Sequence, residues 1–521
     1  MNERRLSWCG ALGLGWALAL LPRPAHGQSA PRALGEQDAV ARAVAQNPTL
    51  HVALLRASQS RLTVTAEQAL YTPIFDASAG YTHSRSPSLF GSDAVRIGTS
   101  DVVDVGAGIT KPFSFGTVLS ASLGGQRWLR SSDSDAALLG GGALGPGYSL
   151  VGQLAVSHPL LRGSGNDVGL ASLRQARLAL GASELAAQQA ASSLLSQVVG
   201  AYWELWYSAE VVRINQASRE LALVQQTQAD QQVASGALAP ASALPYATQV
   251  AELDEAVLGA QTQVRQRELT LAQLLGNAGD VGASLQAVDA PQPPTADEPA
   301  LGSATSEALA SSYARKQLLA ALAIAKDQLK TAGDPLRPRL DVDAYVQAQG
   351  LGNRRVPPAL EQFGKMEAVS AHVGLTFETP LSSTRRTALI QAAQLSQHVA
   401  EKQIRELELQ VRSSVASAIA DRRAARERLE LSTLTEKVAR EQAEAERARF
   451  QAGGSIAIAV QQAEDSLRQA QLRAQRARVD LVLADLRLAE LRGQLLPRYA
   501  SALKRLPASE RITLTRTHTA F

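Results

Sequence analysis

Cysteine, aromatic residues and long apolar runs are all scarce in this chain. Its only cysteine, Cys9, lies near the N-terminus, so the rest has no disulfide framework and no thiol or cysteine metal site. Aromatic residues are only 4%, whereas alanine is abundant, which suits long, closely packed helices better than one thick globular core. No apolar stretch of eighteen residues follows the N-terminal segment, so if the chain enters a membrane it does so as a β-barrel.

Strong charge of one sign is also missing. The formal net charge is +4, and about half of it comes from the N-terminal segment. Lys and Arg are interspersed with Glu and Asp along the chain, which is not the basic footprint of a nucleic-acid-binding protein.

The first residues have the pattern of a secretory signal. Arg4 and Arg5 supply positive charge, an apolar run follows from Cys9 to Leu21, and Ala25-His26-Gly27 is a small-x-small cleavage site. We therefore expect residues 1–27 to be a signal peptide. A retained anchor helix is the alternative, which the two prolines after the run disfavour because they end it too early for a bilayer span. Cys9 is not at the cleavage site, which argues against lipidation.

The chain contains one order of elements twice, over residues 39–275 and 304–492. Each copy has a short helix, β segments around a loop, and then a very long helix with a glycine break. The predicted organisation is a signal peptide (1–27), a first repeat (28–275), a Pro-rich linker (276–303), a second repeat (304–496) and a C-terminal tail (497–521).

Several segments alternate between apolar and polar residues with a period of two. The clearest are Leu340–Ala348 and Val369–Phe377, and Phe75–Tyr81 shows the same pattern. Each is about ten residues long, roughly the length of a tilted transmembrane strand. A soluble sandwich would also alternate, but it would have many more strands at close spacing. The membrane interpretation is therefore favoured.

Two long stretches, from Asn166 to about Ser235 and from Thr384 to about Gln451, contain no proline and almost no glycine. At about 1.5 Å per residue each helix would be roughly 100 Å long, which is deeper than any compact domain. We expect a projecting coiled-coil column. A break at Ala234–Pro240 or Ala452–Ser455, followed by a returning helix, predicts a hairpin turn at the far tip.

Together these features resemble the TolC-like outer membrane efflux proteins, the outer membrane factors. The resemblance covers about residues 36–496 and rests on the duplication, Gln46-Asn47-Pro48, the junctions His158-Pro159-Leu160 and Thr379-Pro380-Leu381, and Gly236 and Gly453. It implies an α+β membrane protein: a homotrimer that closes one outer membrane β-barrel, continued by a long periplasmic α-helical coiled-coil tunnel. The implied function is passive exit of solutes or proteins for an inner-membrane pump or a type I secretion system, reached through a periplasmic adaptor (membrane fusion protein).

The chain departs from the family pattern in its strand number. Family members with one hairpin per repeat have four strands per chain, but Val102–Thr110 and Thr117–Leu123 add two alternating segments here. We hypothesise six strands per chain and a barrel wider than the usual twelve-strand trimer; an extra hairpin outside the barrel is the alternative. Residues 84–100, 130–147 and 350–368 would then be outward-facing loops.

A second departure concerns the tunnel entrance. In well-known members, Asp residues after the second glycine break ring the entrance, whereas the matching positions here are Ala459 and Gln462. The nearest acids, Glu464 and Asp465, are expected on a different helix face, so cation blockade at this level is not expected. Ser235-Gly236-Ala237-Leu238 matches only part of the tip pattern associated with resistance-nodulation-division adaptors. The predicted tip, gate and adaptor-contact residues are Gly236, Ala237, Leu238, Gly453, Gly454, Ser455, Ala459 and Gln462.

Other motifs have plainer interpretations than catalysis or ligand binding. Gly163–Gly169 resembles a dinucleotide loop but has no βαβ unit around it, so a junction turn is predicted. Tyr202–Tyr207 is expected to pack in the widest part of the column, and Asp341 and Asp343 to line a wet lumen. Arg422–Arg449 is predicted to be a solvated, salt-bridged face. No His pair has metal-ligand spacing and no nucleophile lies beside a base, so no metal, cofactor or enzyme activity is predicted.

The sequence therefore predicts an outer membrane channel with a large periplasmic portion. The partners would be two further copies of the chain, a periplasmic adaptor with its inner-membrane pump, and outer membrane lipid. The alternative is a periplasmic coiled-coil structural or interaction protein that never inserts, which would have no use for the strands at 340–349 and 369–377. An adaptor protein is disfavoured because adaptors have one coiled-coil hairpin, not two in tandem.

Overall fold

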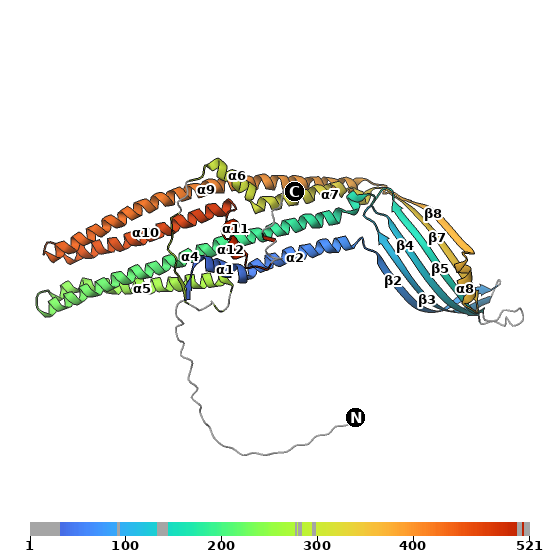
Figure 1. Cartoon of the computed structure of the whole chain (residues 1–521), viewed down its shortest axis with the longest axis horizontal. Helices are drawn as coiled ribbons and strands as arrows, with labels where there is room; N and C mark the ends of the chain where they lie inside the picture. The colour runs from blue at the N-terminus through green and yellow to red at the C-terminus, as the bar shows by residue number, and fades with distance from the viewer. Residues whose placement is uncertain are drawn as a thin grey trace, which may run out of the picture.

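A computed structural model describes residues 32–90, 94–132, 144–276, 279, 284–293, 298–507 and 513–514 of the 521-residue chain. The predicted signal peptide lies outside these residues. The molecule is elongated, with a β-sheet at one end and long helices running away from it (Figure 1). Within the described ranges, no helix combines the length and the apolar character that a bilayer span requires.

The predicted duplication is present as two long helical hairpins. In the first repeat α4 (Ala171–Ala234) returns as α5 (Pro240–Leu275), and in the second α9 (Thr384–Gln451) returns as α10 (Ala457–Leu491). Helix α4 has 64 residues and α9 has 68, so each is about 100 Å long. The remaining helices are α1 (Glu36–Gln46), α2 (Pro48–Ala69), α3 (Asn166–Gly169), α6 (Leu301–Ser311), α7 (Tyr313–Thr331), α8 (Pro357–Gly364), α11 (Leu495–Arg498), α12 (Ala500–Leu503) and a 3-10 helix (Asp334–Leu336).

The Gln46-Asn47-Pro48 motif is the start of α2. The Asn47 side chain accepts hydrogen bonds from the backbone N–H groups of Thr49 (2.9 Å) and Leu50 (3.2 Å), and Pro48 occupies the first helical position, where no N–H is needed. Asn47 Nδ2 also donates to the Leu274 carbonyl at 2.8 Å. The motif therefore caps one helix and fixes it to the end of α5.

All six strands near the helix junction form one antiparallel sheet, in the order β2-β3-β4-β5-β7-β8. Residues 102–124 lie inside this sheet, so the hypothesis of six strands per chain is confirmed. A separate parallel pair joins the start of the described chain to the linker. The strands are β1 (Arg32–Leu34), β2 (Ile74–Phe90), β3 (Ala94–Pro112), β4 (Val118–Ser132), β5 (Leu144–Pro159), β6 (Leu285–Ala287), β7 (Arg339–Asn353) and β8 (Ala368–Glu378).

The prediction that residues 84–100, 130–147 and 350–368 form outward-facing loops is largely wrong. Residues 84–90 and 94–100 continue β2 and β3 in register, with Ser84 opposite Ser100, because hairpin pairing satisfies their backbone groups; Pro87 opposite Ile97 also extends the apolar face. In the second predicted loop, β4 continues to Ser132 and β5 begins at Leu144, and the middle lies outside the described residues. The third predicted loop contains the end of β7 and the helix α8.

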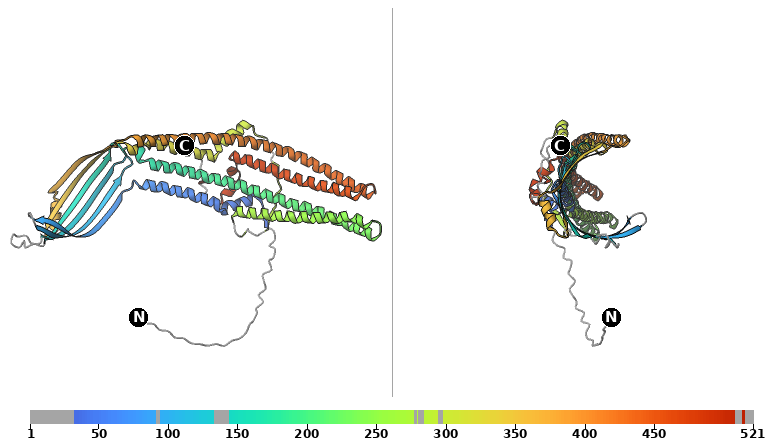
Figure 2. Two further views of the ribbon diagram at one scale, coloured as in Figure 1. Left: turned by 180° about the vertical axis from the view of Figure 1, so that it is seen from behind. Right: turned by 90° about the vertical axis from the view of Figure 1, so that its right-hand side faces the viewer.

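The register of the strands separates the two faces of the sheet. One row across all six strands is apolar: Phe75, Ile109, Ala121, Leu154, Val346 and Ala371. The next row is polar or small: Asp76, Gly108, Ser122, Gln153, Gln347 and Ser370. The sheet is curved in cross-section, as Figure 2 (right) shows. The alternation in each strand thus gives a single sheet with one apolar face and one polar face.

Both repeats meet in one apolar core at the middle of the helices. It contains Tyr202, Leu195 and Leu271 from the first hairpin and Val479 and Leu486 from α10. The C-terminal tail, for which the sequence predicts no role, also packs here through Tyr499, Leu503, Leu506 and Leu514. The predicted linker is structured as well, because β6 lies within it and pairs with β1.

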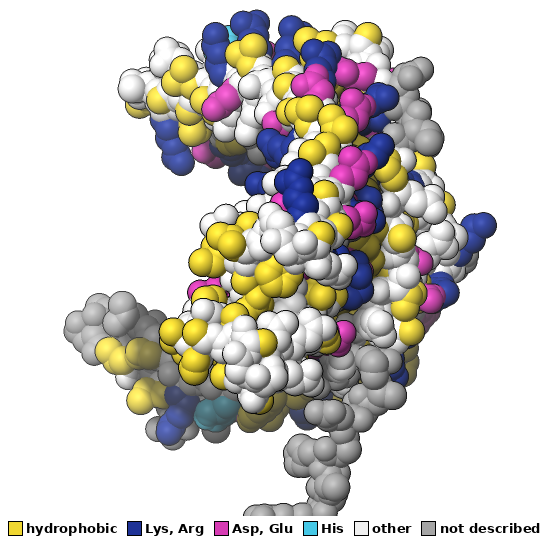
Figure 3. Space-filling view, turned by 90° about the vertical axis from the view of Figure 1, so that its left-hand side faces the viewer, with side chains coloured by type: hydrophobic (Ala, Val, Ile, Leu, Met, Phe, Trp, Pro, Cys, Tyr) yellow, Lys and Arg dark blue, Asp and Glu magenta, His cyan; other side chains and the backbone are white. Residues whose placement is uncertain are grey.

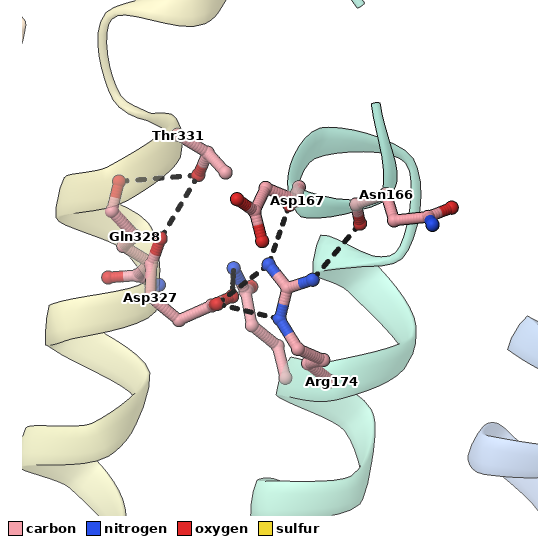
Figure 4. A network of polar contacts seen from close by, with 7 residues as sticks. Asn166, Asp167, Arg174, Asp327, Gln328 and Thr331 are labelled. Atoms are coloured by element: carbon pink, nitrogen blue, oxygen red, sulfur yellow. Dashed lines mark hydrogen bonds and ion pairs between the residues drawn. The ribbon is translucent and has the colours of Figure 1, made fainter. Parts of the chain in front are cut away.

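A polar network joins the repeats where the sheet passes into the helices (Figure 4). Arg174 of α4 donates to Asp327 of α7 at 2.8 Å and to the carbonyls of Asn166 (3.1 Å) and Asp167 (2.6 Å). Nearby, Gly163 has a φ of 81° and its N–H donates to Asp334 at 2.9 Å. The segment predicted as a junction turn is therefore one.

Candidate functional site: the helical tips

Both hairpin turns have the same backbone geometry. In the first turn, Gly236 has a φ of 75°, its N–H donates to Val233 O at 3.0 Å, and Ala237 N donates to Gln232 O at 2.8 Å. In the second turn, Gly453 has a φ of 76°, and the matching bonds are Gly453 N to Phe450 O (3.0 Å) and Gly454 N to Arg449 O (2.9 Å). Each is a complete Schellman motif, in which glycine takes the left-handed position.

The structure brings the predicted tip residues to one end of the molecule, farthest from the sheet (Figure 1). Gly236, Ala237, Gly453 and Gly454 are exposed in the two turns, whereas Leu238 and Ser455 are half-buried. The Ser455 hydroxyl bonds to the Glu446 carboxylate. Ala459 and Gln462 lie in the first two turns of α10, the former half-buried and the latter exposed.

Charge is distributed unequally between the two tips. Between Glu220 and Glu252 the first hairpin has a single charged residue, Asp230, whereas α9 and α10 carry many charges of both signs near their turn. Figure 3 shows this from the tip end: the Lys, Arg, Asp and Glu side chains gather over the upper hairpin, and the lower one is mostly apolar or uncharged. Bound partners would therefore meet two chemically different tips.

A groove of about 650 Å³ runs between α5 and α10 just behind the tips. Gln249 and Glu252 line it from α5, and Gln462 and Asp465 line it from α10. Asp465 therefore lies on the same side of α10 as Gln462, so the prediction that it faces elsewhere is wrong; an i, i+3 spacing places the two side chains next to each other. Its carboxylate pairs with Arg468 on the same helix.

Glu464 points away from this groove and links the two hairpins. Its carboxylate accepts from Gln225 of α4 at 2.9 and 3.0 Å and from Arg447 of α9 at 2.8 Å. Closer to the middle of the column, Arg468 donates to Asn215 at 3.2 Å. The hydrogen bonds of the described residues contain no link between α4 and α10 nearer to the tips than Glu464 and Gln225. The final two turns of each hairpin can therefore move without breaking a polar contact between the hairpins.

Still closer to the sheet, Arg476 of α10 donates to Glu204 of α4 at 2.9 Å, and its guanidinium lies over the Tyr207 ring, 5.2 Å from the centroid. Burial raises the pKa of Tyr207. Within the predicted aromatic segment, Tyr202 is fully buried and Trp203 is 4% exposed. The segment packs between helices, as predicted.

The sequence did not reveal these links between hairpins. Gln225 and Asn215 are uncharged and have no charge pattern to reveal a partner more than 200 residues away. The predicted solvated face also contains an exception: Arg422 is only 6% exposed, with Nε 3.1 Å from Asp485 Oδ1. Burial against α10 explains the difference, because one guanidinium turns inward from an otherwise exposed helix face.

Comparison with known proteins agrees with this architecture. Residues 304–494 match the family described as outer membrane efflux protein. The match covers the second repeat. The match confirms the resemblance noted from the sequence and, with it, the predicted location in the outer membrane with a large periplasmic portion. No curated protein matches the chain in sequence.

Solved outer membrane channels have the same fold along almost the whole chain. The CmeC channel of Campylobacter jejuni is 14% identical, with a TM-score of 0.65 over 91% of this chain and 90% of that one. VceC of Vibrio cholerae is 16% identical, with a TM-score of 0.64 over 88% of this chain and 96% of that one. The open-state MtrE channel of Neisseria gonorrhoeae is 17% identical, with a TM-score of 0.60 over 88% and 89%. Both repeats thus have the channel fold, although only the second matches the family in sequence.

Proposed function

We propose that the protein is the outer membrane exit duct of a tripartite efflux pump or a type I secretion system. It would form a homotrimer and let small molecules or proteins pass out of the periplasm passively, without chemistry of its own. The observation that carries this proposal is the six-stranded sheet with one apolar face, one polar face and two free edges, continued by two long helical hairpins.

The free edges favour closure by further copies. Strands β2 and β8 each pair on one side only, and an unpaired strand edge cannot be tolerated in hydrocarbon. Three copies of a six-stranded sheet would close a barrel of eighteen strands. Such a barrel would be wider than one built from four strands per chain, because the diameter grows with strand number.

The exposed apolar face favours a lipid environment. On the edge strand β8, Val373 is 75% exposed, Leu375 70% and Phe377 64%. Their neighbours in the register rows are also apolar, so the face is a continuous apolar surface that water would not solvate well. A coiled-coil protein that never inserts, the alternative function, gives no reason for this surface.

The gate would lie in the tips, where the last polar link between hairpins is Glu464 with Gln225 and Arg447. We propose that a periplasmic adaptor binds at the tips and parts the hairpins there. The family's acidic ring is replaced by Ala459 and Gln462, and the carboxylate beside Gln462, Asp465, is paired with Arg468, so divalent cations should not block the entrance at this level.

The test is planar-bilayer conductance of the detergent-purified protein, together with its oligomeric mass on the same sample. The proposal expects a trimer that gives discrete conductance steps. A matched pair of variants separates the faces of the sheet: Val373→Asp, on the apolar face, should prevent insertion, whereas Ser370→Asp, on the polar face of the same strand, should not. A soluble species that never conducts would instead support the periplasmic coiled coil.

A further inference from the structure

Helix α8 is packed onto the apolar face of the sheet. Three glycines on that face, Gly152 of β5 and Gly350 and Gly352 of β7, form its seat. A Cβ on Gly152 would lie 2.8 Å from the Phe363 ring, one on Gly350 would lie 1.9 Å from Ala359 O, and one on Gly352 would lie 2.2 Å from Arg355 O. The helix therefore lies directly against the strands, and it lies on the convex side of the sheet (Figure 2).

Helix α8 also provides a hydrogen-bond partner for a backbone group at the edge of β7. The last residue of β7 that pairs with β8 is Gln349. The backbone of β7 beyond Gln349 therefore has no neighbouring strand on that side. Gln362 of α8 accepts the N–H of Leu351 at 3.0 Å. The contact fixes the rotation of α8 on the sheet, with the buried Ala359 and the half-buried Phe363 facing the strands.

Apolar side chains are exposed along the flank of α8, while the outermost position holds Glu361, which pairs with Lys365. Leu360 is 55% exposed and Val356, one turn earlier, is 44% exposed; Met366, just after the helix, is 69% exposed. A short surface helix in water normally has a polar outer side. Here the only charges on the outer side are one Glu–Lys pair, and the exposed apolar side chains beside it suit a helix at the boundary between a protein surface and the acyl region of a membrane.

Positive charge flanks the same helix. Arg354 and Arg355 precede α8, both are exposed, and no acidic side chain pairs with either among the described residues. Arg354 has a φ of 63°, unusual for a residue with a Cβ, and its N–H donates to Pro146 O at 2.8 Å. Arg127 and Tyr148 lie in the register row of Gly352, on the same face of the sheet. Basic and tyrosine side chains thus lie in the strands beside α8, as at a membrane surface.

We propose that α8 and the two arginines before it bind the headgroups of anionic, phosphate-bearing lipid in the membrane leaflet farther from the helices. Leu360 and Val356 would contact acyl chains while Arg354 and Arg355 bind lipid phosphate. This inference rests on the proposed membrane insertion of the sheet. It adds a lipid-binding surface on the outside of the barrel that is separate from the duct.

The position of α8 is tested with spin labels on single cysteines, because the chain after Cys9 has no cysteine of its own. Trimers carrying labelled Leu360→Cys are placed in phosphatidylglycerol-containing bilayers, with Val373→Cys and Gln347→Cys as apolar-face and polar-face controls. Collisions of the Leu360 label with oxygen should exceed those with a water-soluble nickel chelate, as for Val373. If the Leu360 label is exposed to water while the Val373 label is exposed to lipid, the α8 proposal alone is overturned. The same holds if protein shields the Leu360 label from both reagents. If the Val373 label is also in water, the proposed duct fails too.

The lipid class is tested by native mass spectrometry of trimers taken from mixed phosphatidylglycerol and phosphatidylcholine. The preference for phosphatidylglycerol should fall about fivefold for each arginine removed in Arg354→Asn and Arg355→Gln. Asn tolerates the left-handed backbone at position 354. The matched control is Lys365→Gln, because Lys365 already pairs with Glu361 at 2.5 Å. An unchanged preference overturns the proposal, and so does full competition by inorganic phosphate, which would identify a free-anion site.

Discussion

The hydroxyl groups of two buried tyrosines tie the first repeat, the linker and the C-terminal tail together. Tyr202 is fully buried; its hydroxyl donates to Asp289 Oδ2 at 3.0 Å and accepts from Asp289 N at 3.1 Å. Asp289 also accepts the Glu36 N–H at 2.7 Å, and Tyr499 donates to the Glu36 carboxylate at 2.5 Å. Four residues from four segments thus form one chain of hydrogen bonds.

Tyr202→Phe should lower the stability of the folded protein by about 0.5–1.5 kcal/mol, because the buried hydroxyl that bonds to the exposed Asp289 would be lost. Thermal unfolding in detergent measures the effect. Tyr246→Phe is the matched control: this tyrosine is 9% exposed, and its hydroxyl has no hydrogen-bond partner among the described residues. Equal melting temperatures for the two variants would contradict the role of the Asp289 bonds.

Alkaline pH should weaken the same network. Burial, helped by the Glu36 carboxylate, raises the pKa of Tyr499 above its usual 10.0. The folded state therefore favours the neutral phenol: its stabilisation is complete below about pH 10 and is lost as pH rises from there through the raised pKa. Melting temperatures should fall above pH 10, and less steeply for Tyr499→Phe than for the unchanged protein. Parallel curves would show that Tyr499 does not contribute.

At the scale of elements, the two hairpins share a turn but differ in surface. The Schellman motifs at Gly236 and Gly453 match bond for bond, whereas charge gathers on α9 and α10. The turn is fixed by the need to end a helix and reverse the chain, which one left-handed glycine solves in both repeats. The surface is free to differ, because it contacts other molecules and not the turn.

Gly236→Ala and Gly453→Ala should each cost about 1 kcal/mol, because the left-handed backbone is unfavourable for alanine and a Cβ would meet nothing within 4 Å in either place. Amide hydrogen exchange at the tips should rise about fivefold. Gly259→Ala, inside α5 and equally uncrowded, is the control and should stabilise its helix by a similar amount. Slower exchange at the tips in the first two variants would contradict the backbone argument.

Glu464→Ala should favour an open entrance, because it removes the polar link nearest the tips from α10 to both α4 and α9. A loss of about 1 kcal/mol would shift the balance between closed and open tips about fivefold. Single-channel recording measures the time spent in the larger conductance. Glu441→Ala, exposed on α9, is the control. The gate would have to lie elsewhere if both variants behaved alike.

For the whole molecule, the curvature and free edges of the sheet matter more than any single contact. A cysteine at Ser78 on β2, combined in turn with one at Ser370 or His372 on β8, should cross-link neighbouring copies, since all three face the polar side. Covalent trimers in denaturing gels are expected for the combination that comes into register. Ser78→Cys with a cysteine at Val373 is the control, because Val373 faces the other side. Cross-linking only within one chain would contradict closure between copies.

Prediction from the sequence succeeded where a local pattern was sufficient. The long helices follow from the absence of proline and glycine between residues 384 and 451, and the tips follow from Gly236 and Gly453. It failed where pairing decided the outcome: residues 84–100 are rich in serine and glycine, yet they continue β2 and β3 because each strand satisfies the other's backbone. It also missed Glu464 with Gln225 and the docking of the tail through Tyr499, which depend on contacts between distant segments.

The sequence by itself determined the duplication, the long helical hairpins, the turn positions and which residues of each strand share a face. These depend on periods of two and 3.6 residues and on glycine, all of which act over a few residues. Only the tertiary structure decided that six strands make one sheet, that α8 covers three glycines on its apolar face, and that Asp465 lies beside Gln462. Those outcomes depend on the register between strands and the rotation of packed helices, which are set when the whole chain closes its backbone hydrogen bonds and buries its apolar surface.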